Sequence, residues 1–286
     1  MTVTQDGLLA LSQPERIREY GPKECMLYAA SIGLGADPLD REQLRFVFEQ
    51  DLKVMPSMAC VLDWDDTLVF TSGLDGRQIV HGEQRLVLHR PLQPMDFIVA
   101  RERVKAAYDK GEGRGALLVV EKTILEEESR TPICTLESVV FARADGGYGG
   151  PSGGPEPLPA VPEGAPASAY DSVTRPEAAI FYRLNGDPNP LHIDPDFAAD
   201  AGFDRPILHG LCTWGHACHA VVRLCCDYRP ERITSFAARF SAPVFPGETL
   251  RTEVWPVSGG VHFRTVALER GQPVLTHGYA EIASVR

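Results

Sequence analysis

The chain has 286 residues, of which 44% are hydrophobic and 23% charged, as in an ordinary globular protein. Its formal net charge of −11 argues against nucleic acid or an anionic membrane as a partner. No apolar run reaches the roughly 18 residues that a membrane span needs. A length of 286 residues exceeds one comfortable core, so we expect two domains.

Three features favour a cytoplasmic location. The seven cysteines are scattered and odd in number, which fits a reducing compartment better than a disulfide framework. The N-terminus lacks a basic segment followed by an apolar core, so no signal peptide is expected. The C-terminal Ser284-Val285-Arg286 is not a peroxisomal SKL-type address.

The first notable motif lies at Asp63, Asp65 and Thr67, which match the D-x-D-x-T nucleophile loop of haloacid-dehalogenase-type phosphatases. That chemistry also needs Mg²⁺, a downstream lysine, a further acidic pair and alternating βαβ units. The residues after Thr67 read instead as strands and turns. We therefore favour an acidic surface turn between strands over a phosphatase site.

A domain boundary follows near the middle of the chain. Residues 146–167 consist mainly of Gly, Pro, Ser and Ala, with almost nothing to bury. Such a composition predicts a linker that is partly flexible and partly extended. The domains are then residues 1–145 and 168–286.

The segment Tyr182–Asp194 carries the strongest functional signal. It places a carboxylate, Asp187, five residues before the imidazole of His192, and Asn189 stands between them with a proline on each side. The prolines fix φ and remove backbone donors, so the segment is a stiff loop. A stiff loop suits general acid–base groups, which must reach the same reacting atoms. The alternative is that Asp187 only caps the helix that follows.

Two helices are expected after this loop. Asp194 opens a short helix that Gly202 ends. Residues Ile207–Val222 are small, apolar and nearly uncharged, which predicts a helix buried on almost all sides. His209 and Gly210 stand at its beginning, where an exposed N–H could hold a developing oxyanion. Gly210 could equally serve only to permit close packing.

The same helix carries His216 and His219, with Cys212 and Cys218 nearby. The two histidines are spaced i, i+3 and share a face. However, the cysteines lack the paired CxxC geometry of a zinc site. We expect no metal site here, and small residues of a buried helix explain the cysteines better.

The two halves look like diverged copies of one unit. His89–Ile98 parallels Ser241–Leu250 at a constant offset of 152 residues. Each half reads as a helix followed by strands, and Val261–Leu268 and Val274–Ile282 form a hairpin around Arg270-Gly271. A helix on a mostly antiparallel sheet is an α+β architecture.

Only the second copy has the polar loop. The segment Tyr28–Asp40 can be laid on the loop without gaps, but Gly33 then faces Asp187 and Pro38 faces His192. The first copy therefore retains the general pattern of the segment but lacks the catalytic side chains. This predicts one active site per chain.

The loop resembles the signature of the hydratase 2 family, the MaoC-like (R)-specific enoyl-CoA hydratases: G-D-x-N-P-[LIV]-H-x5-[AS]. The matching residues are Gly186, Asp187, Asn189, Pro190, Leu191, His192 and Ala198. Asn185 departs from the small residue of the family, which we interpret as an adjustment of the turn. The resemblance covers nearly the whole chain and implies a double hot-dog fold, with an acyl-tail-binding first half and a catalytic second half.

The resemblance also implies the reaction, which is reversible hydration of a trans-2-enoyl-CoA to a (3R)-3-hydroxyacyl-CoA. Asp187 and His192 would deprotonate the water and return a proton to C2, Asn189 would orient the water, and the Gly210 N–H would hold the thioester oxygen. The expected substrate-binding residues are Gly186 and His209. CoA is part of the substrate, so no cofactor or metal is implied, and the partner is a second copy in a homodimer.

Two other functions stay open at this point. Hot-dog proteins include thioesterases, which would hydrolyse the acyl-CoA instead of hydrating it. A non-catalytic acyl-CoA-binding protein is disfavoured because the acid and imidazole positions are intact in one half only. The acyl chain length, the residues that bind the CoA phosphates and the division of proton transfers between Asp187 and His192 stay open too.

Overall fold

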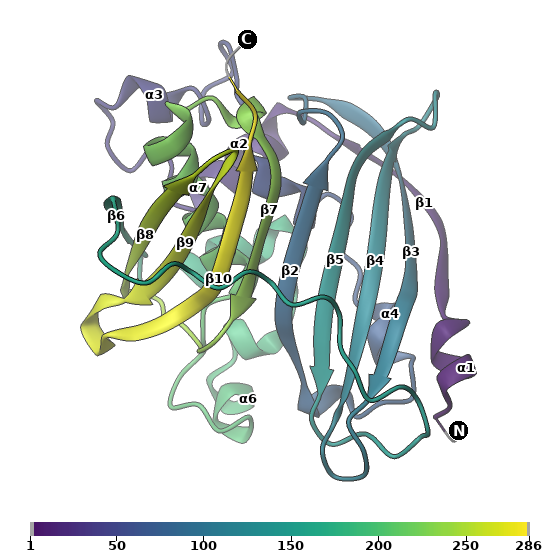
Figure 1. The fold of residues 1–286 in the computed structure, drawn as a ribbon. Helices are drawn as coiled ribbons and strands as arrows, with labels where there is room; N and C mark the ends of the chain where they lie inside the picture. The colour runs from purple at the N-terminus through teal and green to yellow at the C-terminus, as the bar shows by residue number, and fades with distance from the viewer. Residues whose placement is uncertain (1–2, 285–286) are drawn as a thin grey trace.

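The structure is a computed structural model that describes residues 3–284. The described residues leave out Met1, Thr2, Val285 and Arg286. The expectations about a signal peptide and a peroxisomal address therefore fall partly outside the described residues. Ten strands form one sheet in the order β1-β3-β4-β5-β2-β7-β10-β9-β8-β6, and every neighbouring pair is antiparallel (Figure 1). No helix within residues 3–284 is long and apolar enough to span a membrane.

Each half contributes five strands, with short helices between them. The first half contains α1 (Gln5–Leu9), β1 (Ser12–Tyr20), α2 (Pro22–Ser31), α3 (Arg41–Leu44), η1 (Pro56–Cys60), α4 (Thr67–Phe70), η2 (Gly76–Gln78), β2 (Ile79–Leu88), β3 (Asp96–Asp109), β4 (Ala116–Glu126) and β5 (Pro132–Ala142). The second half contains β6 (Ser168–Val173), α5 (Ala178–Tyr182), η3 (Arg183–Asn185), η4 (Pro190–His192), α6 (Pro195–Asp200), α7 (Gly210–Cys226), η5 (Pro230–Arg232), β7 (Ile233–Phe240), β8 (Thr249–Val257), β9 (Gly260–Ala267), η6 (Leu268–Arg270) and β10 (Gln272–Ile282).

The strand order supports the internal repeat. Read from its outer edge to the centre, the first half runs β1-β3-β4-β5-β2, and the second runs β6-β8-β9-β10-β7. The two orders are the same when strands are numbered within each half. The copies meet at the centre, where Glu83–Val87 of β2 pairs with Ser235–Arg239 of β7. The hairpin expected from the sequence is present as β9 and β10.

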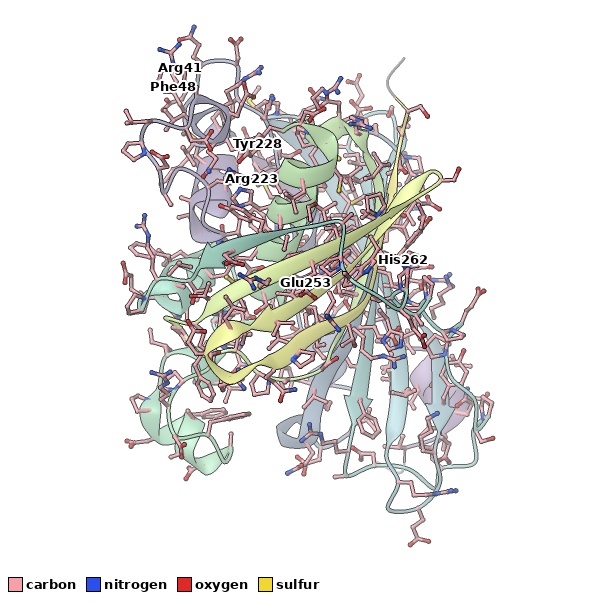
Figure 2. All side chains as sticks on the ribbon, turned by 60° about the vertical axis from the view of Figure 1, so that its left-hand side comes forward. Arg41, Phe48, Arg223, Tyr228, Glu253 and His262 are labelled. Carbon is pink, nitrogen blue, oxygen red and sulfur yellow. The ribbon has the colours of Figure 1, made fainter. Side chains whose placement is uncertain are left out.

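Helix α7 is the central element of the second half. It begins at Gly210, three residues later than expected, because His209 has the extended φ and ψ of −55° and 134°. It ends at Cys226, where Asp227 turns left-handed at φ 51°. Arg223 stacks at that end over Tyr228 (Figure 2), and a cation is favoured there by the helix dipole.

The first half has no equally long helix. At the offset of 152 residues, α7 corresponds to residues 58–74, which contain only the end of η1 and the four-residue α4. All five residues of η1 are buried, and this short turn packs against α7. The hydrophobic core therefore extends continuously from the second half into the first.

The segment between the halves contains no helix or strand from residue 145 to 167. It crosses the outer face of the sheet in front of β10 and β2 (Figure 1). Hydrogen bonds fix it, since Trp255 Nε1 donates to the carbonyl of Gly164 at 3.3 Å and Arg85 donates to that of Glu156 at 2.6 Å. The linker is thus extended and anchored at these points, where the composition suggested partial flexibility.

Candidate active site

The loop of the second half begins at a position whose backbone conformation requires glycine. Gly186 ends η3 at φ 119°, a left-handed conformation that side chains disfavour. Asp187 follows and is 7% exposed. Its Oδ1 accepts a hydrogen bond from the N–H of Asn189 at 3.1 Å. Asp187 therefore fixes its own loop, and the cap of the helix that follows is a different residue, Asp194.

Asn189 and His192 are held by short turns. Asn189 Oδ1 accepts from the N–H of Leu191 at 3.0 Å and so caps η4, the turn that carries His192. His192 Nδ1 lies 2.8 Å from the carbonyl oxygen of Ile207. Because a carbonyl only accepts, Nδ1 carries the proton and Nε2 is the free acceptor.

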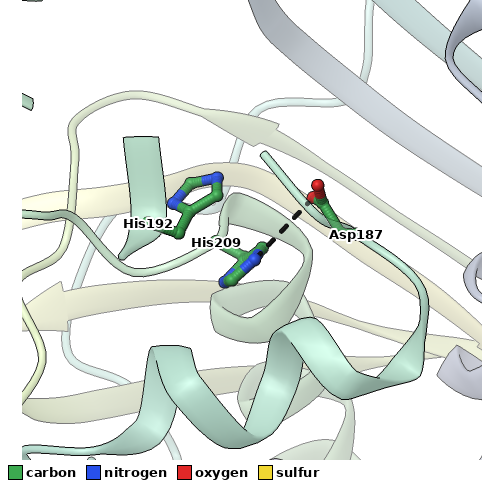
Figure 3. A group of neighbouring side chains, drawn as sticks. All are labelled: Asp187, His192 and His209. Atoms are coloured by element: carbon green, nitrogen blue, oxygen red, sulfur yellow. Dashed lines mark ion pairs between the residues drawn. The ribbon is translucent and has the colours of Figure 1, made fainter. Parts of the chain in front are cut away.

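His209 brings the beginning of α7 against this loop (Figure 3). Its ring stacks on His192 with centroids 3.7 Å apart and an angle of 26° between the planes. Its Nε2 lies 3.9 Å from Asp187 Oδ2. His209 is 1% exposed, and neither ring nitrogen has a hydrogen-bond partner among the described residues. A buried polar ring without partners is costly, which is typical of a functional site.

Burial determines the charges of this group. It raises the pKa of Asp187 to about 6, and it lowers the pKa of His192 to about 4. Burial, with the neighbouring His192, lowers the pKa of His209 to about 2. Near pH 7 both imidazoles are therefore neutral, and Asp187 is ionised yet able to take up a proton. Its contact with the neutral His209 is then not an ion pair.

Gly210 is the first residue of α7, so its N–H has no partner within the helix ladder. This end of the helix carries partial positive charge. A Cβ atom at Gly210 would lie 3.2 Å from Cε1 of Phe240, so the ring lies directly against the backbone. The structure therefore allows both expected roles, close packing and donation to an oxyanion.

A metal is the other ligand that such a group could hold. One ligand atom from each of Asp187, His192 and His209 lies within 4.8 Å of the other two. The two imidazole rings, however, are stacked, with centroids 3.7 Å apart and planes only 26° apart. Lone pairs lie in the plane of each ring, so two stacked rings point theirs past each other and not at one ion. The absence of a metal stays a prediction, with the ring stacking as its physical support.

The histidines in the middle of α7 are buried and pack within the core. His216 Nδ1 lies 2.7 Å from Ser172 Oγ, and His219 is fully buried beside the ring of Tyr170. Gly33 packs against His216, since a Cβ there would lie 3.0 Å from its Cε1. The position in the first half that aligns with Asp187 is therefore filled by core packing.

Sequence reasoning missed two contacts at this site. Phe240 covers Gly210, and Trp64 of the first half covers Gly186. Nothing in the local pattern around either aromatic residue points to the loop, because each contact joins distant segments. The D-x-D-x-T match did single out the turn of Trp64, although for a different chemistry.

Comparison with known proteins places the chain. Residues 19–144 match the family model "MFE-2 hydratase 2 N-terminal domain", and residues 159–277 match the model "MaoC like domain". "Enoyl-CoA hydratase 2, peroxisomal" of Arabidopsis thaliana is 36% identical over 97% of this chain and 94% of that protein. The chain belongs to the hydratase 2 family.

Other hydratase 2 relatives and solved structures agree. The peroxisomal multifunctional enzyme type 2 of Drosophila melanogaster is 34% identical over 93% of this chain, which spans 46% of that longer protein. A MaoC-like dehydratase from Phytophthora capsici superposes with a TM-score of 0.87, at 31% identity, over 98% of this chain and 99% of that one. A Mycobacterium tuberculosis protein described as a double hotdog fold has a TM-score of 0.60 at 14% identity, over 94% of this chain and 93% of that one. The expected double hot-dog fold is confirmed.

Proposed function

We propose that this hydratase 2 protein catalyses the reversible hydration of a trans-2-enoyl-CoA to a (3R)-3-hydroxyacyl-CoA. One observation carries the proposal. Asp187 and the neutral His192 lie at one buried site with His209, the residue that immediately precedes the Gly210 N–H at the beginning of α7 (Figure 3). The Arabidopsis relative named enoyl-CoA hydratase 2 supports the hydration of an enoyl-CoA.

The chemistry of the substrate fits this set of groups. A thioester polarises the adjacent double bond, so C3 becomes electrophilic and C2 becomes a latent enolate. The free Nε2 of His192 is an acceptor for a proton of the attacking water. Asp187, whose pKa is about 6, exchanges protons near neutral pH. The pair together removes a proton from water and returns one to C2 on the same face.

The remaining groups bind and orient. The Gly210 N–H stabilises the negative charge that develops on the thioester oxygen. The Oδ1 of Asn189 is engaged in capping η4, so only its Nδ2 is left to orient the water or the product hydroxyl. Gly186 and His209 shape the pocket around the thioester. The CoA moiety belongs to the substrate, and the proposed chemistry uses no cofactor.

An assay with two readouts, loss of the conjugated double bond and release of free thiol, tests this function. Purified protein with crotonyl-CoA should consume the conjugated double bond, followed by ultraviolet absorbance, without releasing free thiol to a disulfide reagent. Thiol release at a comparable rate would favour the thioesterase. Binding of the acyl-CoA without loss of the double bond would favour the non-catalytic acyl-CoA-binding protein. Heat-inactivated protein gives the background rate for both readouts.

We further propose a homodimer in a reducing, cytoplasmic location. The seven cysteines are all unpaired within residues 3–284, which supports a reducing compartment. Light scattering after gel filtration measures the mass in solution, and a monomer would contradict the dimer. Cell fractionation tests the location, and recovery with organelles would contradict it.

A further inference from the structure

The turn Asp63–Asp66 of the first half lies against the catalytic loop of the second half. Its first residue, Asp63, has a fully buried side chain. Arg16 donates to Asp63 Oδ2 at 2.5 Å, and the ammonium of Lys122 lies 3.8 Å from the same oxygen. Lys122 also donates to the backbone carbonyl of Asp63. A carboxylate held by these charged partners is not available as a nucleophile. Asp63, the first residue of the D-x-D-x-T match, instead anchors the turn.

The anchor fixes Trp64 against Gly186. A Cβ atom at Gly186 would lie 3.1 Å from Trp64 Cβ and 3.8 Å from its Cγ. The left-handed backbone of Gly186, which leads into Asp187, therefore packs directly against the tryptophan. Trp64 Nε1 is buried without a hydrogen-bond partner among the described residues. The indole of Trp64 therefore acts on the loop through the packing of its ring and not through a hydrogen bond.

The end of the turn adds a charge. Burial is the main cause that raises the pKa of Asp187, the N–H of Asn189 lowers it, and the charge of Asp66 raises it further. Arg183 acts in the opposite direction. The two imidazoles of His192 and His209 each have a ring nitrogen within 4.8 Å of the Asp187 carboxylate, and both are neutral near pH 7.

We propose that this turn is a contribution of the first half to the catalytic centre, in which Trp64 positions Asp187 through Gly186. Trp64 is a positioning residue, because it is not assigned a contact with the reacting atoms. The proposal rests on the proposed function for its kinetic readout.

The test uses Trp64→Ala, Trp64→Phe and Asp66→Asn in the full chain, with Trp255→Ala as a matched control on the outer face. The pKa of Asp187 is measured by carboxyl ¹³C NMR of aspartate-labelled protein, and Asp187→Asn assigns the signal. Trp64→Ala removes the ring beside Gly186 and reduces the burial that raises the pKa of Asp187, so that pKa should fall by about 0.5 pH unit or more. Asp66→Asn should lower it as well, because the charge of Asp66 raises it. Trp64→Phe and Trp255→Ala should leave it near the wild-type value.

The pH dependence of the hydration rate should shift in the same direction as the pKa of Asp187. Asp187 transfers a proton in the proposed reaction, so the rate of hydration changes as the pH passes through the pKa of that group. The limb of the pH–rate profile that reports Asp187 should shift to lower pH in Asp66→Asn and Trp64→Ala. Trp64→Ala should also reduce kcat by about 10-fold or more with little change in KM, because the carboxylate is misplaced. Trp64→Phe, which keeps the packing and removes Nε1, should restore most of kcat.

Two results would overturn the proposal. One is an unchanged pKa of Asp187 in Trp64→Ala, with thermal unfolding showing that this variant is folded. The other is a Trp64→Phe variant as impaired as Trp64→Ala. If Trp64→Ala does not fold, Trp64→Leu replaces it in both measurements. Failure of the proposed function would look different, since the wild-type protein would then not hydrate crotonyl-CoA, and the NMR arm would still report on Trp64 and Asp66.

Discussion

Replacing Asp187 by Asn, or His192 by Ala, should each lower kcat for the hydration of crotonyl-CoA by about 10³-fold or more. Asparagine keeps the shape and can still accept the N–H of Asn189, but it cannot exchange a proton. Alanine at 192 removes the free Nε2 acceptor. Because the two groups act as a unit, the double variant should be hardly worse than either single one.

A matched control comes from the other copy of the repeat. Pro38 aligns with His192 and is exposed, so Pro38→Ala should leave kcat within about two-fold, as expected for a surface change away from the site. Steady-state rates and thermal unfolding should be recorded for all four proteins. If either single variant at the catalytic loop keeps a tenth of the wild-type kcat while folded, the roles assigned to Asp187 and His192 are wrong.

Replacing Gly210 by Pro should lower kcat by about 10²-fold to 10³-fold, the usual cost of one lost oxyanion donor. Proline removes the N–H, and the first position of a helix is where proline is best tolerated. The preceding residue, His209, already has the extended conformation that a following proline demands. The helix should therefore survive the change while the donor is lost.

Gly210→Ala separates the donor from the packing. It keeps the N–H and places a Cβ against Phe240 at the same 3.2 Å distance. Both variants should show similar thermal unfolding, and the alanine variant should keep most of its activity. Equal losses in the two proteins would show that packing at Gly210 matters and that its N–H does not stabilise the thioester oxygen.

Local chemistry explains which parts of this site the sequence could predict. The spacing of Asp187, Asn189 and His192 lies within one loop whose stiffness comes from its own prolines, so no distant residue was needed. The short helix α6 was predictable for the same reason, because Asp194 caps it from the adjacent position. The double hot-dog fold followed from the family resemblance and the repeat.

The parts that were missed depend on contacts between distant segments. The stacking of His209 on His192 needs the beginning of α7 to meet the loop, and no local pattern gives that angle. The beginning and end of α7 depend on the backbone angles of His209 and Asp227, whereas the apolar pattern itself extends further toward the N-terminus. Trp64 belongs to the first half and contacts Gly186 of the second half. The buried ion pair of the neighbouring Asp63 holds this turn in place.

The stereochemistry of the product tests the central claim most directly. Asp187, His192 and the Gly210 N–H belong to one half, so they should deliver water to one face of the alkene. Product formed from crotonyl-CoA is coupled in parallel to an (R)-specific and an (S)-specific 3-hydroxyacyl-CoA dehydrogenase with their nicotinamide cofactors. The account predicts rapid cofactor reduction with the R-specific enzyme and almost none with the S-specific one. Rapid reduction with the S-specific enzyme would contradict it.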